Sequence, residues 1–248
     1  MISWVDRLRR QAARWGGEGV DLLFPPRCAW CHRDLEAAAA FCPACARELA
    51  ADCQRCLRCG EPGGDGEGCS RCRGRRVEWQ GIAVLGGYGD SLRDAILRAK
   101  HPGGDDLSRA LGRLLVDKHR ETFAAWNLDG VVPVPMHWLR RAARGTSAAH
   151  ELARAVARLL GLPLLVAVSR HKATRMQNEL PVQERRGNVQ DAFRPRQRVE
   201  GRRLLLVDDV ITTGATLTAC GQTLVAAGAE AVFVSAIARA DREPEAHS

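Results

Sequence analysis

Hydrophobic and polar residues follow different patterns before and after about residue 77. After it, short apolar runs alternate with longer segments in which apolar residues recur at helical spacing, which predicts strands alternating with amphipathic helices. The expected strands are residues 82–85, 130–135, 164–168, 203–207 and 232–237. The expected helices are residues 92–99, 107–126, 147–160 and 216–227. This alternation predicts an α/β fold with a parallel sheet and helices on both faces.

The chain before residue 77 has few large apolar residues outside its first segment. An amphipathic helix is expected over residues 3–15, where one face carries Trp4, Leu8, Ala12 and Trp15. Two prolines after Phe24 end this segment, because proline cannot continue a helix. Residues 28–75 are short hydrophilic pieces between cysteines, so bound metal must supply much of their folding energy.

The cysteines of this region are spaced as metal ligands. The chain has ten cysteines, of which nine lie between Cys28 and Cys72. Pairs with two intervening residues are Cys28 with Cys31, Cys42 with Cys45, Cys56 with Cys59, and Cys69 with Cys72. Such a pair forms a tight turn that supplies half of a tetrahedral site. A disulfide framework would require a secretory context, and the start of the chain lacks the apolar stretch of a signal peptide. We therefore expect two structural zinc ions, each held by four thiolates.

One ligand of the second zinc site stays open. Cys53 and Cys56 have the same spacing as Cys56 and Cys59, so either pair satisfies the pattern. Gly60 follows Cys59, and glycine relieves crowding after the last thiolate of a metal-binding turn. This favours Cys59 as the ligand and leaves Cys53 as a spare thiol.

Composition and charge narrow the class of protein. The chain has 248 residues, 46% of them hydrophobic and 27% charged, which is a globular balance. Its apolar stretches are too short to span a bilayer, so we expect a cytoplasmic protein. The formal net charge is +8, and residues 131–210 alone carry 15 basic and 7 acidic side chains. Such a concentration predicts a polyanionic partner, with a solvated basic face as the alternative.

The stretch LLLVDDVITTGAT, residues 204–216, carries the clearest chemistry. A buried strand delivers Asp208 and Asp209 at its carboxyl end, where open α/β sheets bind ligands. Backbone N–H groups, threonine hydroxyls and a helix amino end then favour a phosphate, while carboxylates suit sugar hydroxyls. The stretch predicts a sugar-phosphate pocket. The competing interpretations are a Walker B strand, for which the chain has no P-loop, and simple helix capping.

This stretch resembles the phosphoribosyl pyrophosphate signature of type I phosphoribosyltransferases. The resemblance implies that Asp208 and Asp209 bind the ribose hydroxyls of a magnesium-bound donor. It implies that the 5-phosphate is held by Thr212, Thr213, Gly214, Ala215 and Thr216. Residues 132–135 resemble the pyrophosphate loop of amidophosphoribosyltransferases, which implies donor contacts at Val134, Pro135 and Met136. Residues 170–193 resemble the mobile catalytic loop of that group, in which Lys172 is a candidate to neutralise the leaving pyrophosphate.

Cysteine pairs in front of such a domain make the chain similar to the ComF family, with its ComFC and GntX-like members, over nearly its whole length. Shared stretches include residues 23–28 (LFPPRC), 96–100 (ILRAK) and 184–188 (ERRGN). Members are linked to natural competence and DNA uptake. The chain has RGTSA at residues 144–148 where the family usually has RGFNQ, a departure that bears on turnover more than on binding of the sugar phosphate.

The resemblance implies three parts and two interpretations of function. The parts are an N-terminal helix and linker (1–27), a double zinc ribbon (28–75) and a phosphoribosyltransferase-like domain (77–243). The first interpretation is a phosphoribosyltransferase whose acceptor the sequence does not identify. The second is a non-catalytic module that senses a ligand or binds single-stranded DNA. Expected partners are phosphoribosyl pyrophosphate, single-stranded DNA, DNA-uptake proteins and a second copy of the chain.

Overall fold

The computed structural model describes residues 26–35, 39–50, 55–63, 68–70, 72–73, 77–136, 148–171 and 192–241. The chain divides into two compact units, Met1–Ala46 and Arg47–Ser248. The helix expected over residues 3–15 and the spare Cys53 lie outside the described residues. The boundaries expected at residues 27, 75 and 77 stay a prediction.

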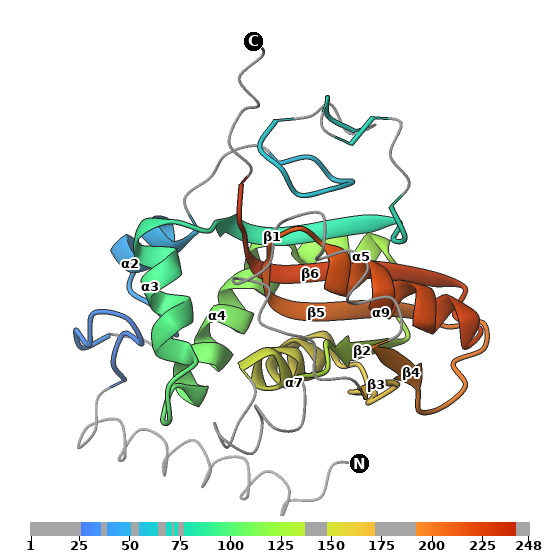
Figure 1. Cartoon of the computed structure of the whole chain (residues 1–248). Helices are drawn as coiled ribbons and strands as arrows, with labels where there is room; N and C mark the ends of the chain where they lie inside the picture. Colours follow the sequence, from blue (N-terminus) through green and yellow to red (C-terminus); the bar gives the residue numbers. More distant parts are fainter. Residues whose placement is uncertain are drawn as a thin grey trace, which may run out of the picture. The chain divides into compact units, whose positions relative to one another are not determined.

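The second unit contains a parallel sheet of four strands in the order β1-β6-β5-β2. Figure 1 shows β1 uppermost and the other strands below it in this order. The strands are β1 (Gly81–Gly87), β2 (Gly130–Pro133), β5 (Arg203–Ile211) and β6 (Ala231–Arg239). All nine residues of β6 are buried, because a central strand between two helical layers has no face toward solvent. The predicted parallel α/β sheet is thereby confirmed.

Helices pack on both faces of this sheet. They are α3 (Asp90–Ala99), α4 (Asp105–Lys118), α5 (Arg120–Ala125), α7 (Ala148–Leu160) and α9 (Ala215–Ala226). Leu204 and Leu206 of β5 share one hydrophobic core with Leu217 and Leu224 of α9. Helices α4 and α7 pack on each other and on the sheet, α4 against β1 and β6 and α7 against β5 and β2. Successive side chains of a strand point to opposite faces, so α9 covers one face of β5 and α7 packs on the other.

Two expected elements differ from the observed ones. The single helix expected over residues 107–126 is wrong, because His119 leaves the helical conformation (φ −112°, ψ 24°) between α4 and α5. Its ring Nε2 lies 2.8 Å from the carbonyl oxygen of Val84. The strand expected over residues 164–168 is also displaced, since β3 spans Val168–Arg170. It pairs antiparallel with β4 (Phe193–Pro195), which is not among the strands predicted from the sequence.

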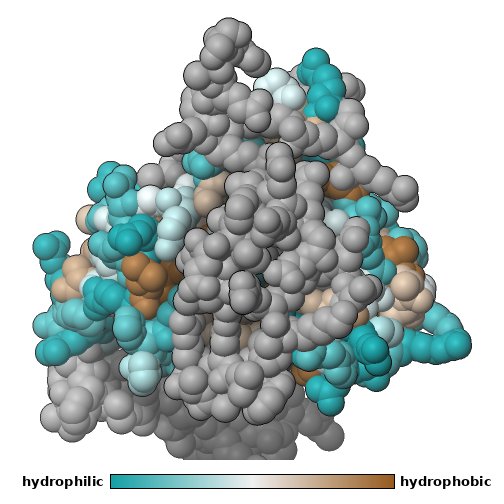
Figure 2. All heavy atoms as spheres, in the orientation of Figure 1, coloured by the Kyte–Doolittle hydropathy of each residue, from teal (hydrophilic) through white to brown (hydrophobic). Residues whose placement is uncertain are grey.

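The described surface is predominantly hydrophilic. On the face drawn in Figure 2, hydrophobic side chains form only small patches between hydrophilic ones. Large hydrophobic side chains that are exposed are those of Leu57, Leu97, Leu159, Val166 and Val225. Among the residues that the structure describes, no helix has both the length and the apolar character that crossing a bilayer requires.

Candidate functional sites: two cysteine clusters and the carboxyl edge of the sheet

The first cysteine cluster is organised by a short hairpin in the first unit. Arg27 and Asp34 form an antiparallel bridge, and the Nε of Arg27 lies 3.0 Å from Oδ1 of Asp34. Between them, the backbone N–H of His32 donates to the carbonyl of Cys28 at 2.9 Å and closes the turn. The Sγ atoms that this arrangement gathers within 4.8 Å of one another belong to Cys28, Cys31, Cys42 and Cys45.

The second cluster repeats this arrangement within the second unit. Arg55 and Pro62 form an antiparallel bridge, and the N–H of Gly60 donates to the carbonyl of Cys56 at 2.8 Å. Gly60 has φ +77°, a left-handed conformation that glycine adopts without strain. The Sγ atoms within 4.8 Å of one another are those of Cys56, Cys59, Cys69 and Cys72. Cys59 therefore takes the position that the sequence left open.

Both clusters fit zinc. Four thiolates at about 2.3 Å from a tetrahedral zinc ion lie about 3.8 Å from one another. The Sγ–Sγ distances are 3.9 Å for Cys31 and Cys42, and 3.7 Å for Cys56 and Cys72. Burial raises the pKa of Cys45 and of Cys59 well above that of an ordinary thiol, so each cluster needs a cation to hold all its thiols ionised. This agrees with the predicted pair of four-cysteine zinc sites.

We expect two zinc ions per chain in the purified protein, because each cluster offers four thiolates at zinc-binding separations. Elemental analysis against protein concentration measures this ratio. Cys42→Ser and Cys69→Ser, which each remove one ligand from a different cluster, should each reduce it to one. Protein without zinc, or mass spectrometry that finds disulfides within the pairs, would contradict the assignment.

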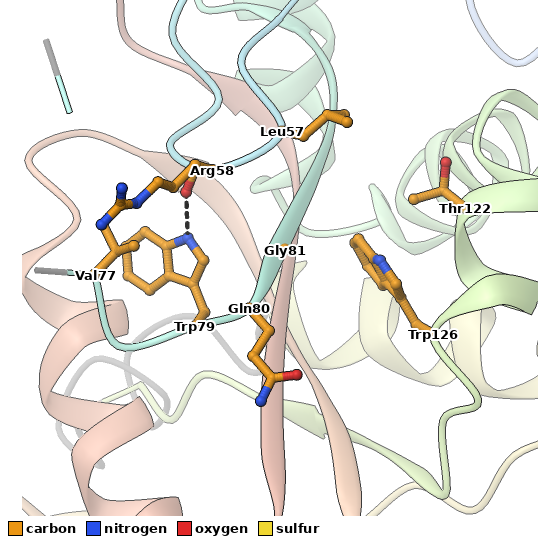
Figure 3. A pocket seen from close by; sticks show the side chains of 8 residues that line it. All are labelled: Leu57, Arg58, Val77, Trp79, Gln80, Gly81, Thr122 and Trp126. Carbon is orange, nitrogen blue, oxygen red and sulfur yellow. Dashed lines mark hydrogen bonds between the residues drawn. The ribbon is translucent and has the colours of Figure 1, made fainter. Parts of the chain in front are cut away.

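The second cluster also packs against the edge strand β1. The N–H of Ile82 donates to the carbonyl of Leu57 at 3.1 Å. The indole Nε1 of Trp79 donates to the carbonyl of Arg58 at 2.8 Å, as Figure 3 shows. An open edge strand invites pairing with other chains, and this contact covers part of that edge. The second cluster is therefore packed on the sheet.

A cavity of about 440 Å³ lies beside this contact, at the amino end of β1. Figure 3 shows Trp79 and Trp126 on either side of Gly81, the first residue of that strand. In a parallel sheet, the amino end of β1 and the carboxyl end of β5 lie at opposite edges. The cavity is consequently separate from the site expected at Asp208 and Asp209.

The two acids of β5 lie on opposite faces of the sheet. Asp209 lines a small cavity with residues of α4 and α7, whereas Asp208 lies near Cys220 in α9, where burial and then the charge of Asp208 raise the pKa of the Cys220 thiol. Each acid also accepts a backbone hydrogen bond, Asp208 Oδ1 from the N–H of Asp209 at 2.9 Å and Asp209 Oδ1 from the N–H of Val210 at 2.7 Å. Burial, followed by the charge of Asp209, raises the pKa of Asp208 to about 8.

Lys100 reaches this edge from the end of α3. Its Nζ lies 2.9 Å from Oδ2 of Asp209, and both side chains are only partly exposed. Sequence patterns assigned this lysine no function, although it ends the stretch ILRAK that the chain shares with the ComF family. That stretch was the one available signal, because 109 positions separate the lysine from its partner in the sequence.

The turn after β5 has the geometry expected of a phosphate site. Gly214 has φ +78° and immediately precedes α9, which begins at Ala215. The hydroxyl of Thr213 accepts a hydrogen bond from the backbone N–H of Ala215 at 3.3 Å. The amino end of a twelve-residue helix thus lies at the carboxyl edge of the sheet, where the helix dipole and backbone N–H groups favour an anion.

Part of the expected pyrophosphate loop also lies at the carboxyl edge of the sheet, beside the strand that carries Asp208. The N–H of Val134 donates at 2.9 Å to the carbonyl of Val207, the residue before Asp208. Val134 is buried, and the next two residues, Pro135 and Met136, are half-buried. Lys172 lies outside the described residues, as do residues 144–147, which carry most of the departure from the ComF pattern.

The comparisons with known proteins give one family match for the cysteine-rich part of the chain and one for the part that forms the sheet. A family described as a double zinc ribbon domain matches residues 19–73, and one described as a phosphoribosyl transferase domain matches residues 105–247. The protein named DNA utilization protein YhgH of Escherichia coli (strain K12) is 32% identical over 224 residues, covering 88% of this chain and 99% of that protein. Competence protein F of Haemophilus influenzae is 31% identical over 230 residues with the same coverage. Among solved structures, the APRTase of Giardia lamblia matches with a TM-score of 0.37 and 18% identity, over 60% of this chain and 72% of that one.

Proposed function

Because this chain belongs to the ComF family, with a double zinc ribbon followed by a phosphoribosyltransferase domain, we propose that it binds phosphoribosyl pyrophosphate and transfers its phosphoribosyl group. One observation carries this proposal. Two carboxylates and a left-handed glycine turn at a helix amino end occur together at the carboxyl edge of one parallel sheet. Sugar hydroxyls and a phosphate on the same ligand match that combination.

Each of three groups of residues binds a different part of the donor. The turn from Thr212 to Thr216 holds the 5-phosphate, with Thr213, Gly214 and Ala215 between them. Asp208 and Asp209 accept hydrogen bonds from the ribose hydroxyls. Residues 134–136 (Val134, Pro135, Met136) continue from β2 beside these acids and receive the pyrophosphate.

Magnesium fits the same edge, because carboxylate oxygens such as those of Asp208 and Asp209 are the ligands that this hard cation prefers. Bound magnesium would help to neutralise the pyrophosphate. Positively charged side chains of the protein also neutralise the pyrophosphate. Lys100 lies beside Asp209, and we assign Lys172 the same role toward the departing group.

The transfer is a displacement at the anomeric carbon. The bond from this carbon to the pyrophosphate oxygen breaks, its electron pair leaves with the pyrophosphate, and the acceptor atom forms the new bond. Positive charge develops on the ribose as that bond breaks. The protein orients the sugar through the two acids and the phosphate turn, which lowers the entropic part of the barrier. Neutralising the leaving group lowers the electrostatic part.

We place this activity in DNA uptake. The names of the relatives, DNA utilization protein and Competence protein F, support that process, and single-stranded DNA is the partner that the basic residues 131–210 would bind. The reduced thiols of two zinc clusters fit the cytoplasm. A second copy of the chain and other DNA-uptake proteins are further proposed partners.

Titration calorimetry with phosphoribosyl pyrophosphate and magnesium tests the donor site, and release of pyrophosphate over a panel of acceptors tests transfer. The panel should be run with and without single-stranded DNA. Donor binding followed by release with one acceptor is the expected result. Donor binding without release over the whole panel would favour the ligand-sensing interpretation, and no donor binding would contradict the proposal.

Lys100→Met should weaken donor binding by roughly tenfold or more, since a hydrogen bond to a charged group contributes about 1.5–3 kcal/mol. Lys100 pairs with Asp209 in the structure. Once donor hydroxyls occupy Asp209, the ammonium becomes available to the pyrophosphate. Calorimetric titration measures the change.

Arg93→Met is the matched control for this substitution. It removes a positive charge from the same helix, at a side chain that is 54% exposed and pairs with Asp94. This variant should bind the donor with the affinity of the natural protein. Equal affinities of the Lys100→Met variant and the natural protein would refute a role for Lys100.

A further inference from the structure

A buried ion pair joins the second cysteine cluster to the end of the central strand β6. The Nη2 and Nε of Arg239 lie 2.7 and 3.1 Å from the same Oε1 of Glu61. Glu61 is 2% exposed and Arg239 is 4% exposed. Glu61 stands two residues after the zinc ligand Cys59, so the acid is fixed by the metal-binding turn itself.

The backbone of Arg239 lies next to the phosphate turn. Arg239 is the last residue of β6 and stands opposite Ile211, the last residue of β5. The following N–H, that of Ala240, donates to the carbonyl of Ile211 at 2.8 Å. Thr212, the first residue of the phosphate turn, comes directly after Ile211. The guanidinium and the turn are therefore anchored on neighbouring strand ends.

Further contacts hold the metal-binding turn against this strand end. Arg55 donates to the carbonyl of Gly60 at 2.9 Å and pairs with Asp241 at 2.8 Å. A side-chain carbon added to Gly60 would lie 3.1 Å from Cδ of Arg239, so the turn and the arginine stem are in close contact. The second cluster is thus attached to Arg239, the last residue of β6, and to Asp241, two residues further along the chain.

Stability alone does not explain why this contact is ionic. Buried ion pairs lose as much solvation as they gain in attraction, and apolar pairs of similar volume often stabilise a protein as well or better. An ion pair with two donors on one oxygen differs in being directional, because it sets where the guanidinium lies. The geometry of the pair therefore favours a role in positioning the guanidinium of Arg239 over a role in stability.

We propose that Glu61 is a positioning residue for the phosphate turn, acting through Arg239, so that the second zinc site determines the affinity for a sugar 5-phosphate. This inference rests on the proposed donor site, and it adds a function for the second cluster that the first does not share. The first cluster lies in the other compact unit and has its own, exposed ion pair between Arg27 and Asp34.

Glu61→Gln tests the inference with two probes, ribose 5-phosphate and inorganic pyrophosphate. It keeps the shape of the side chain and leaves the eight cysteines of the two clusters unchanged. We expect ribose 5-phosphate to bind about tenfold more weakly, within the range measured for residues that act through others, and pyrophosphate to bind as before. Asp34→Asn, which breaks the ion pair beside the first cluster, should change neither affinity.

A second variant keeps the test decisive if the glutamine variant does not fold. Glu61→Met with Arg239→Met replaces the pair by apolar side chains, which buried sites tolerate. This double variant should fold and retain two zinc ions. Its affinity for ribose 5-phosphate should nevertheless be lower than that of the natural protein. Unchanged affinity for ribose 5-phosphate, or an equal loss for both probes, would overturn the inference. Failure of the natural protein to bind either probe would instead overturn the proposed donor site.

Discussion

Above pH 8, where Asp208 is ionised, Asp208→Asn combined with Asp209→Asn should weaken the binding of phosphoribosyl pyrophosphate by about 30- to 1,000-fold, because losing charged acceptors costs roughly 2–4 kcal/mol. Asparagine keeps the oxygen that accepts the backbone N–H next to each acid, so the strand end should retain its shape. Titration calorimetry with magnesium measures the loss. Unchanged affinity in the double variant would remove these acids from the donor site.

The pH dependence of folding stability shows whether the Asp208 substitution weakens donor binding without disturbing the fold. Burial and the charge of Asp209 raise the pKa of Asp208 from 3.8 to about 8. The folded protein then binds a proton that the unfolded chain releases, so the free energy of unfolding falls as the pH rises from about 4 to 8. Asp208→Asn removes this penalty.

Thermal unfolding at two pH values tests this expectation. The Asp208→Asn variant should unfold at a higher temperature than the natural protein at pH 8, and the difference should shrink at pH 5. A variant that is less stable at both values would mean that Asp208 supports the fold as a carboxylate. Its effect on donor binding would then have to be interpreted as a loss of structure.

Cys69→Ser should destabilise the sheet far more than Cys42→Ser, although each substitution removes one ligand from one zinc cluster. The second cluster packs on β1 through Leu57 and supplies Glu61 to Arg239. If its turn unfolds, Arg239 remains buried without its acid, and losing one partner of a buried pair costs about 3–5 kcal/mol. Domains have only about 5–15 kcal/mol in total, so the loss is large.

Thermal unfolding followed by the circular dichroism of the sheet unit measures this difference. Metal analysis should find one zinc ion in each variant, which shows that the two substitutions are matched. The Cys42→Ser protein should unfold near the temperature of the natural protein. Equal losses in both variants would mean that the second cluster is no more part of the sheet unit than the first.

Features set by neighbours in the sequence could be predicted. Cysteine pairs with two intervening residues form metal-binding turns by local geometry, and the structure gathers all eight as expected. Apolar periodicity predicted the four strands of the parallel sheet and most helices, and two acids between a strand and a glycine turn marked the carboxyl edge. Periodicity did not predict the helix break at His119, since the contact of its ring with Val84 joins residues 35 positions apart.

By itself, the sequence determined that the cysteine pairs form two clusters, except for the choice between Cys53 and Cys59, and it determined the parallel α/β class and the place of the glycine turn before α9, because spacing and periodicity act over a few residues. Only the tertiary structure decided that Lys100 pairs with Asp209 and that Glu61 reaches Arg239. Glu61 and Arg239 are 178 positions apart. Such pairs form only when packing has brought distant segments together and excluded water, and no local pattern specifies which partners will meet.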